Sequence, residues 1–147
     1  MEEGTRSSQE DIPQVDWFLQ KLVAIVNQSK LELGITLQIG GLLVSGQLVG
    51  GAQYFEGFAN DFSAGFAADP EIASSIRESL AAYGKVYSKG DESRVDSLDQ
   101  PQFIHLKDAY FYGAATTRIP NNRGIWWRGR LASIEGFNIG TLSMEQA

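Results

Sequence analysis

Few side chains in this sequence of 147 residues could carry out acid–base or covalent chemistry. It has no Cys and a single His, His105, which excludes thiolate nucleophiles, disulfides and metal sites built on two His ligands. A catalytic imidazole needs a carboxylate to orient it, and Asp108 is the only one close by in sequence. His105 lies in an alternating stretch, however, where a single His is more often a cross-strand or surface residue. We therefore expect no catalytic residue and no enzymatic activity.

Two further features could be mistaken for ligand sites. The acidic residues in the segment 91–99 lack the alternating oxygen ligands and the distant Glu of a calcium loop, so a solvated connection is the better interpretation. The Gly pairs at 40–41 and 50–51 are not followed by the Lys and Ser or Thr of a phosphate-binding loop, so they indicate turns. The sequence predicts no metal site and no cofactor.

A row of phenylalanines gives the first sign of an interaction surface. Phe55, Phe58, Phe62 and Phe66 recur at steps of three and four, which places them on one face of a helix. A buried core face is the simpler explanation. The number of aromatic residues, with Tyr54 and several small residues beside them, also suits docking on an apolar partner or on a second copy.

A second candidate lies near the C-terminus, in a predicted strand. Adjacent strand residues point to opposite faces, so only one of Trp126 and Trp127 can enter the core unless another element covers the second. Arg128 and Arg130 share a face with Trp126, and Trp and Arg are enriched at interface hot spots. The sequence therefore predicts an interaction site here, and predicts that replacing both arginines with Glu weakens binding.

The pattern of apolar residues and turn signals gives the order of elements. We expect a helix from an Asp11 N-cap to about residue 28, then two strands around Gly40-Gly41. Two helices follow, the second opened by Asp69-Pro70, and the rest of the chain forms strands. The expected strands after the helices cover residues 103–112, 125–134 and 137–142. This order predicts an α+β fold: an antiparallel sheet of about five or six strands, an N-terminal helix and a two-helix insertion after the first hairpin.

The length fits one domain, which would bury roughly 70% of its unfolded surface. We expect a disordered tail at residues 1–10 and a single domain over 11–147, with a mobile connection at about 85–101. No apolar run approaches the ~18 residues needed to span a bilayer, and the acidic N-terminus lacks the basic start of a signal peptide. The sequence predicts a cytoplasmic protein that does not bind membranes.

Charge is unevenly distributed along the chain. The net charge is −6, yet residues 1–101 hold seven basic and fifteen acidic residues, whereas residues 102–147 hold five and three. An acidic protein is repelled by phosphates, which disfavours nucleic acid as a partner. The asymmetry favours attraction between copies, so we expect a homo-oligomer.

Several segments resemble one family. The segments FIHLK (103–107), GIWWRGRLASIEGFNIG (124–140), LGITLQIGGLLVSG (33–46) and YFEGF (54–58) are similar to the gas vesicle accessory protein U family. The resemblance implies a non-enzymatic cytoplasmic protein that associates with gas vesicles. It also implies a part in vesicle clustering, through self-association and contact with the shell or other gas vesicle proteins.

A second resemblance leaves an alternative open. An N-terminal helix, the pattern L-x-I-x-L-x-I-G-G and a late Arg-Gly strand are also similar to small barrels of the Sm or SH3-like type. This would imply an oligomeric nucleic-acid-binding module. The steepness of salt dependence in nucleic-acid retention would distinguish the two functions.

Overall fold

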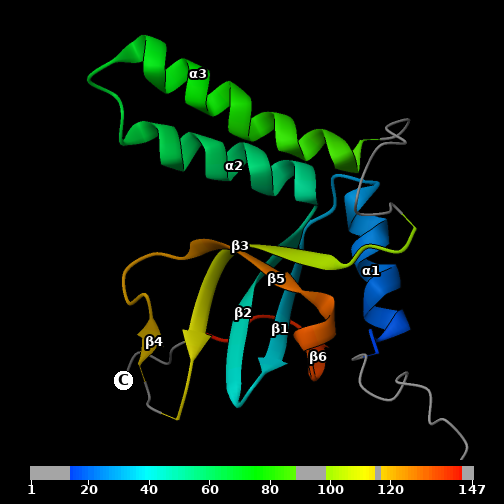
Figure 1. Ribbon diagram of the computed structural model, residues 1–147. Helices are drawn as coiled ribbons and strands as arrows, with labels where there is room; N and C mark the ends of the chain where they lie inside the picture. The colour runs from blue at the N-terminus through cyan, green and yellow to red at the C-terminus, as the bar shows by residue number, and fades with distance from the viewer. Residues whose placement is uncertain (1–13, 89–98, 115–116, 144–147) are drawn as a thin grey trace, which may run out of the picture.

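The computed structural model describes residues 14–88, 99–114 and 117–143. It has the expected α+β order: one helix, two strands, a helical pair, then the remaining strands (Figure 1). The elements are α1 (Trp17–Asn27), β1 (Leu33–Ile39), β2 (Leu42–Val49), α2 (Gly51–Ala64), α3 (Pro70–Ala81), the 3-10 helix η1 (Ala82–Tyr87), β3 (Phe103–Tyr112), β4 (Arg118–Ile119), β5 (Ile125–Arg130), the 3-10 helix η2 (Leu131–Ser133) and β6 (Gly136–Ile139).

The six strands form one antiparallel sheet. Its order is β4-β3-β2-β1-β6. Strands β4 and β5 both pair with the same edge of β3, each along a different half of that strand. Within the described residues β5 and β6 do not pair with each other, so the sheet stays open rather than closing into a barrel. The fold class predicted from the sequence is confirmed.

Helix α1 begins later than the sequence pattern suggested. Its N-cap is Asp16, whose carboxylate accepts a hydrogen bond of 2.9 Å from the backbone N–H of Phe18, and Asp11 lies outside the described residues. The helix buries Leu19, Val23 and Val26 against the sheet. The other buried members of this core come from β1, β2, β3 and η2: Ile35, Leu37, Val44, Leu48, Ile104, Leu106, Ala109 and Leu131.

The first hairpin has the predicted turn. Gly40 and Gly41 have φ angles of +54° and +83°, a conformation that glycine adopts without steric cost, and Ile39 pairs directly with Leu42.

Helices α2 and α3 are inserted between two strands that pair with each other. The last residue of β2, Val49, lies opposite His105 of β3, so the chain leaves the sheet and returns to neighbouring positions. Asp69 caps α3 by accepting from the N–H of Ile72 at 3.3 Å, and Pro70 occupies its first turn, as predicted.

The connection expected at residues 85–101 is only partly described. Residues up to Tyr87 belong to η1, and the Tyr87 ring is buried. Pro101, at the other end, is also buried, and residues 89–98 lie outside the described part of the chain.

Two later strands depart from regular geometry. Strand β3 bends at Asp108, which has a φ of +52°, and its pairing with β5 shifts register between Leu106 and Ala109. Strand β5 ends at Arg130, before the expected residue 134, because the chain turns there into the 3-10 helix η2, with the Leu131 side chain buried.

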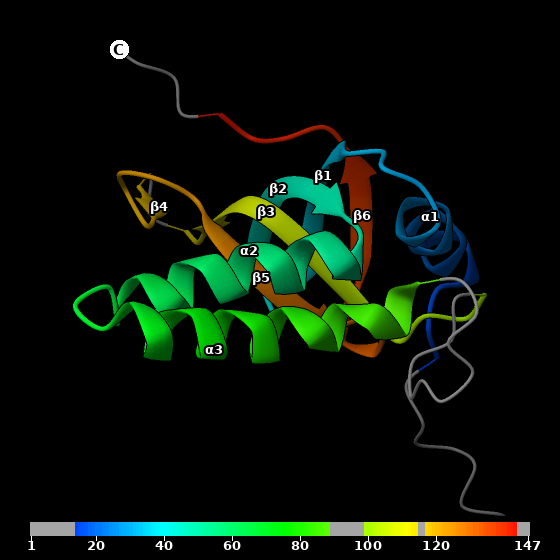
Figure 2. The same cartoon turned by 90° about the horizontal axis from the view of Figure 1, so that it is seen from above.

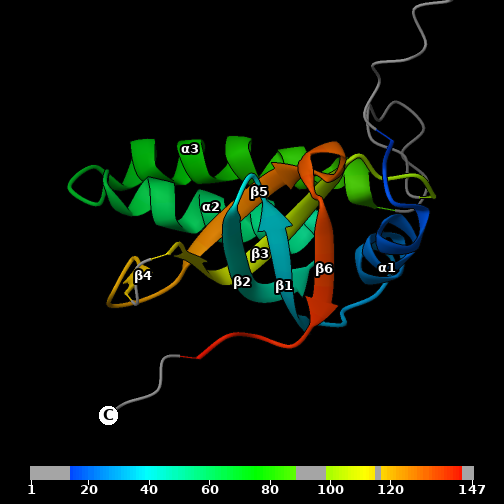
Figure 3. The same ribbon diagram turned by 90° about the horizontal axis from the view of Figure 1, so that it is seen from below.

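The helical pair crosses the top of the sheet with α2 beneath α3 (Figure 1), and its end at the α2–α3 turn extends beyond the strands (Figure 2). Helix α1 lies at the other end of the molecule, beside β6 (Figure 3). The fold therefore has two helical ends that face away from each other.

Candidate interaction site

The phenylalanine row on α2 is divided between two environments. Phe55, near the start of the helix, is partly buried between α2 and the sheet. Phe58, Phe62 and Phe66 follow on the same face and are exposed by 37%, 49% and 42%. The row is thus neither wholly core nor wholly surface.

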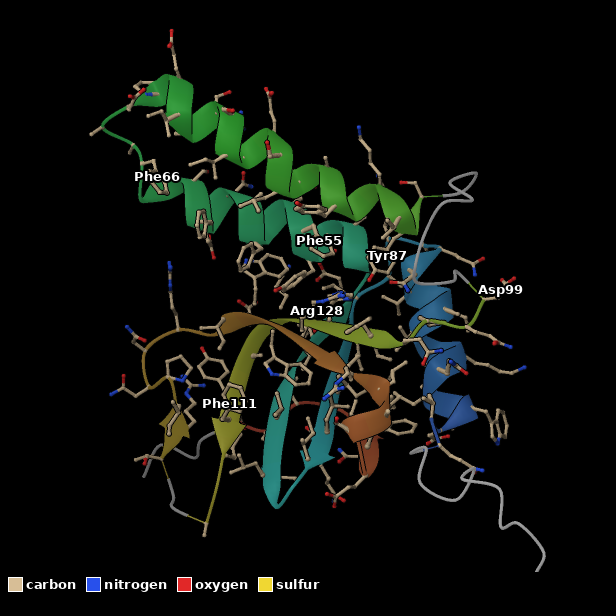
Figure 4. All side chains as sticks on the ribbon, viewed as in Figure 1. Phe55, Phe66, Tyr87, Asp99, Phe111 and Arg128 are labelled. Carbon is tan, nitrogen blue, oxygen red and sulfur yellow. The ribbon has the colours of Figure 1, made fainter. Side chains whose placement is uncertain are left out.

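At the inner end, Phe55 belongs to a cluster built around Arg128 (Figure 4). The Arg128 guanidinium donates hydrogen bonds to the Tyr87 hydroxyl at 3.1 Å and to Nε2 of His105 at 2.7 Å. Its carbon lies 3.8 Å from the centre of the Phe103 ring and 5.4 Å from that of Phe55. We call these five residues the inner cluster.

Strand pairing explains why these residues meet. Arg128 of β5 lies directly opposite His105 of β3, and Phe103 precedes His105 on the same face of the strand. Phe55 and Tyr87 reach the cluster from α2 and η1, and their rings lie 6.2 Å apart. The cluster therefore joins the helical pair to the sheet.

His105 is neutral in this environment. The residue is fully buried, and burial, reinforced by the Arg128 charge, lowers its pKa to about 3. A neutral ring that accepts from Arg128 at Nε2 carries its proton on Nδ1, and Nδ1 has no hydrogen-bond partner among the described residues. Asp108, the carboxylate considered as its orienting group, is exposed. His105 acts as an acceptor for the partly buried Arg128 guanidinium.

The Arg128 charge is held without a carboxylate. Within residues 14–88, 99–114 and 117–143, no Asp or Glu lies within ion-pair distance of it. Aromatic faces and neutral hydrogen-bond acceptors stabilise the guanidinium instead. Arg130, two residues along the strand, is exposed. The structure thus separates two arginines that the sequence pattern grouped together.

The two tryptophans point to opposite sides of β5, as alternation requires. Trp127 packs against the core that α1 and the sheet share. Trp126 lies beneath α2, with its ring 6.2 Å from that of Tyr54 in an edge-on arrangement. Gly57 permits this approach, because a Cβ at that position would collide with the Trp126 ring. Both indoles are partly buried.

At the outer end, the exposed phenylalanines border a groove. A cavity of about 340 Å³ lies between α2 and the start of β5. Most of its lining side chains are apolar, and one is acidic and one basic. The lining residues are Phe58, Asp61, Phe62, Arg123, Gly124, Ile125 and Trp126.

Ile125 extends this apolar surface, which the sequence analysis did not include. It is 40% exposed and lines the same groove as Phe58 and Phe62. The ring centres of Phe58 and Phe62 lie 6.0 Å apart and those of Phe62 and Phe66 lie 5.9 Å apart, so the exposed row is continuous. We call this exposed set the outer face: Phe58, Phe62, Phe66 and Ile125. Tyr83 of η1 is also exposed but lies beside Phe55, at the inner end of the row.

The arginines of the C-terminal third provide less free basic surface than their number suggests. The Arg118 guanidinium lies 3.9 Å above the Tyr110 ring, and Arg128 belongs to the inner cluster. Arg123 and Arg130 are exposed. Two separated, exposed arginines form only a small basic surface for binding nucleic acid, the alternative partner.

The described residues contain neither a cluster of metal-ligand side chains nor a membrane-spanning helix. No three His, Cys, Asp or Glu side chains of residues 14–88, 99–114 and 117–143 gather closely enough to hold a metal ion. In the same ranges, no helix combines the length and apolar content that crossing a bilayer requires.

Comparison with known proteins gives one match. A family model described as gas vesicle protein GvpU-like matches residues 16–142, which include every helix and strand described above. No curated protein and no solved structure matches the chain.

Proposed function

We propose, since this chain belongs to the gas vesicle protein GvpU-like family, that it binds gas vesicles through its outer face and promotes their clustering. Membership makes it a gas vesicle-related protein of a structural or accessory family. The proposal adds the surface that makes the contact, the vesicle shell as its partner, self-association as the means of clustering, and the cytoplasm as its location.

The observation that carries the proposal is the exposure of the outer face. Four large apolar side chains are exposed by 37–49%. Together they present on the order of 300 Å² of apolar surface, taking a large aromatic side chain as roughly 150–250 Å². The largest apolar patch on a monomeric protein is typically about 300–600 Å², and such patches are often binding sites.

The groove beside this patch suits a protein partner. Its Phe and Trp lining can accept an apolar side chain, while Asp61 and Arg123 in the same lining can pair with polar groups of the partner. Protein interfaces commonly combine aromatic contacts with a smaller number of polar ones. A vesicle shell made of protein could present such side chains.

Co-flotation with purified gas vesicles tests the proposal. The full chain should rise with vesicles, and the double variant Phe58→Glu/Phe62→Glu should remain in the subphase, because two carboxylates cannot be desolvated in the contact. Leu42→Glu is the matched control, since Leu42 is 46% exposed on the β1–β2 turn, away from α2 (Figure 1). That variant should float like the unmodified protein.

Repeating the flotation at high ionic strength distinguishes an apolar contact from an electrostatic one. Contact through the apolar outer face should persist at high ionic strength, whereas contact through Arg123 and Arg130 should be released. If the double variant is folded and still floats, the outer face is not the binding surface. If the unmodified protein does not float at any salt concentration, the shell is not its partner.

A further inference from the structure

Helix α1 carries a second exposed apolar surface, separate from the outer face. Trp17, Phe18 and Ile25 are exposed by 68%, 51% and 54%, although the same helix buries its other side in the core. Leu31, just after the helix, is 59% exposed. We call these four residues the α1 face.

This surface continues onto the neighbouring strand. The Phe18 ring lies 5.8 Å from that of Phe137 in β6, and Ile139 of the same strand is 56% exposed. Among the described strands β6 pairs only with β1, so its other edge is open. The α1 face therefore lies beside an open sheet edge.

The α1 face and the outer face occupy opposite ends of the molecule. The views along and across the sheet both place α1 at one end and the α2–α3 turn, next to Phe66, at the other (Figures 1 and 2). One partner of ordinary size that covers one surface would leave the other exposed.

We propose that the α1 face is the self-association surface, and that the α1 face of a second copy occupies it in a twofold dimer. This inference rests on the proposed function, because a protein that clusters particles needs two binding ends. A dimer joined through α1 would direct its two outer faces away from each other, each toward a different vesicle.

The exposed area agrees with a dimer of ordinary size. The four side chains present roughly 400–500 Å² of apolar surface, by the same measure of 150–250 Å² for a large aromatic residue. A standard interface buries about 800 Å² on each partner, of which somewhat more than half is apolar. The α1 face supplies about that apolar share.

The charge distribution is compatible with a second copy at this place. The molecule has a net charge of −6, so most pairs of surfaces on two copies repel each other. On the α1 face, Lys21 lies between the apolar residues with its Nζ 5.9 Å from the centre of the Trp17 ring. The neighbouring carboxylate of Asp16 is bonded to the helix N-terminus. This surface is therefore not acidic.

A symmetric contact has the advantage that one patch serves both partners. In a twofold interface the same residues meet from both sides, so an apolar patch with a central aromatic residue complements itself. Trp17, the most exposed member on the helix, is of the residue type most enriched at such centres.

Sedimentation analysis of the full chain over a concentration range tests the inference. The unmodified protein should dimerise, and Trp17→Glu/Ile25→Glu should weaken the dimer by at least about 30-fold in its dissociation constant, the effect of one interface hot spot. Both positions are exposed, so circular dichroism and the melting temperature should stay unchanged. Leu42→Glu again serves as the control and should dimerise normally.

Vesicle assays separate this inference from the proposed function. The α1 variant should still float with vesicles but fail to cluster them, whereas Phe58→Glu/Phe62→Glu should dimerise but fail to float. If the α1 variant dimerises normally, or if the unmodified protein is monomeric at every concentration, the inference is wrong. If dimers form and depend on Trp17 while the unmodified protein does not float, the inference holds and the proposed function fails.

Discussion

The inner and outer ends of the phenylalanine row use the same residue type for different purposes. Phe55 packs with Tyr87 and the Arg128 guanidinium, whereas Phe62, two helical turns further on, is 49% exposed beside an open groove. The helix is the same, and its apolar face is continuous. What differs is the element opposite it: η1 and β5 close over the inner end, and no described element closes over the outer end.

Helical periodicity therefore identifies the apolar face of a helix but does not indicate which other element packs against it. At the inner end, Phe55 helps to hold the helical pair on the sheet. At the outer end, the same face projects apolar surface away from the fold. Changes at the inner end should therefore lower stability, and changes at the outer end should alter binding.

The largest effect is expected at Arg128. Arg128→Glu places a carboxylate among aromatic rings and removes the bonds to Tyr87 and His105, which should lower the free energy of unfolding by about 3–5 kcal/mol. Arg130→Glu, at an exposed position on the same strand, should change it by less than about 0.5 kcal/mol. Urea denaturation measures both. Equal effects would show that the inner cluster does not hold the fold together.

This result bears on the double replacement of Arg128 and Arg130 that the sequence pattern suggested. Loss of binding in that variant would reflect loss of folding at Arg128. Arg130→Glu alone is the informative change, because it alters surface charge while leaving the inner cluster intact.

A matched pair of phenylalanines tests the comparison directly. Phe55→Ala should lower stability by about 3 kcal/mol through lost ring contacts with Tyr87 and Arg128. Phe62→Ala should leave stability within about 0.5 kcal/mol and reduce vesicle flotation. Thermal and urea unfolding, followed by flotation, measure both variants. A large loss of stability in Phe62→Ala would mean that the outer end is also structural.

The pH dependence of stability between pH 5 and pH 8 tests the inner end. His105 has a pKa of about 3 in the folded protein and about 6.5 when unfolded, so between these values the unfolded chain binds a proton that the folded protein does not. Stability should be full above pH 6.5 and fall by about 1.4 kcal/mol per pH unit below it, or about 2 kcal/mol by pH 5.

The control for this effect is His105→Gln, whose amide oxygen can still accept from Arg128. Urea unfolding between pH 5 and pH 8 should show a slope for the unmodified protein and a much smaller one for the variant. The same slope in both proteins would assign the effect to other groups.

A smaller stability loss than at Arg128 or Phe55 is expected at the boundary between the two ends. Gly57→Ala introduces a Cβ that collides with the Trp126 ring, so α2 must shift or the indole must turn, at a cost of about 1–2 kcal/mol. The higher helix propensity of Ala would offset part of this cost. Tryptophan fluorescence and urea unfolding measure the change. A gain in stability would show that Trp126 is not tightly packed.

The elements that depend on local chemistry could be predicted from the sequence. Gly40-Gly41 set the first turn through positive φ angles, and Asp69-Pro70 began a helix through capping and a fixed φ. The start of α1 was placed too early, because the cap is Asp16, whose carboxylate accepts from the N–H of Phe18, rather than Asp11.

The candidate site was only partly predictable, because its burial depends on contacts between distant residues. Arg128 donates a hydrogen bond to Tyr87, which lies forty-one residues earlier in the chain, and no local sequence pattern predicts a contact between residues so far apart. Trp17 and Ile25 did not enter the sequence analysis at all. Helical periodicity identifies the apolar side of α1 that packs on the core, and only the structure shows that apolar residues on its other side are exposed.

The insertion of the helical pair between two paired strands has a consequence for how the chain folds. The β1–β2 hairpin is local and can form within microseconds, but pairing of Val49 with His105 must wait until the chain between them closes on itself. The entropy of closing such a loop grows only as the logarithm of its length. The helical pair could therefore lengthen, shorten or carry different surface residues at little thermodynamic cost to the sheet. In evolution, the part of the molecule that touches a partner could change while the register of the strands stays the same.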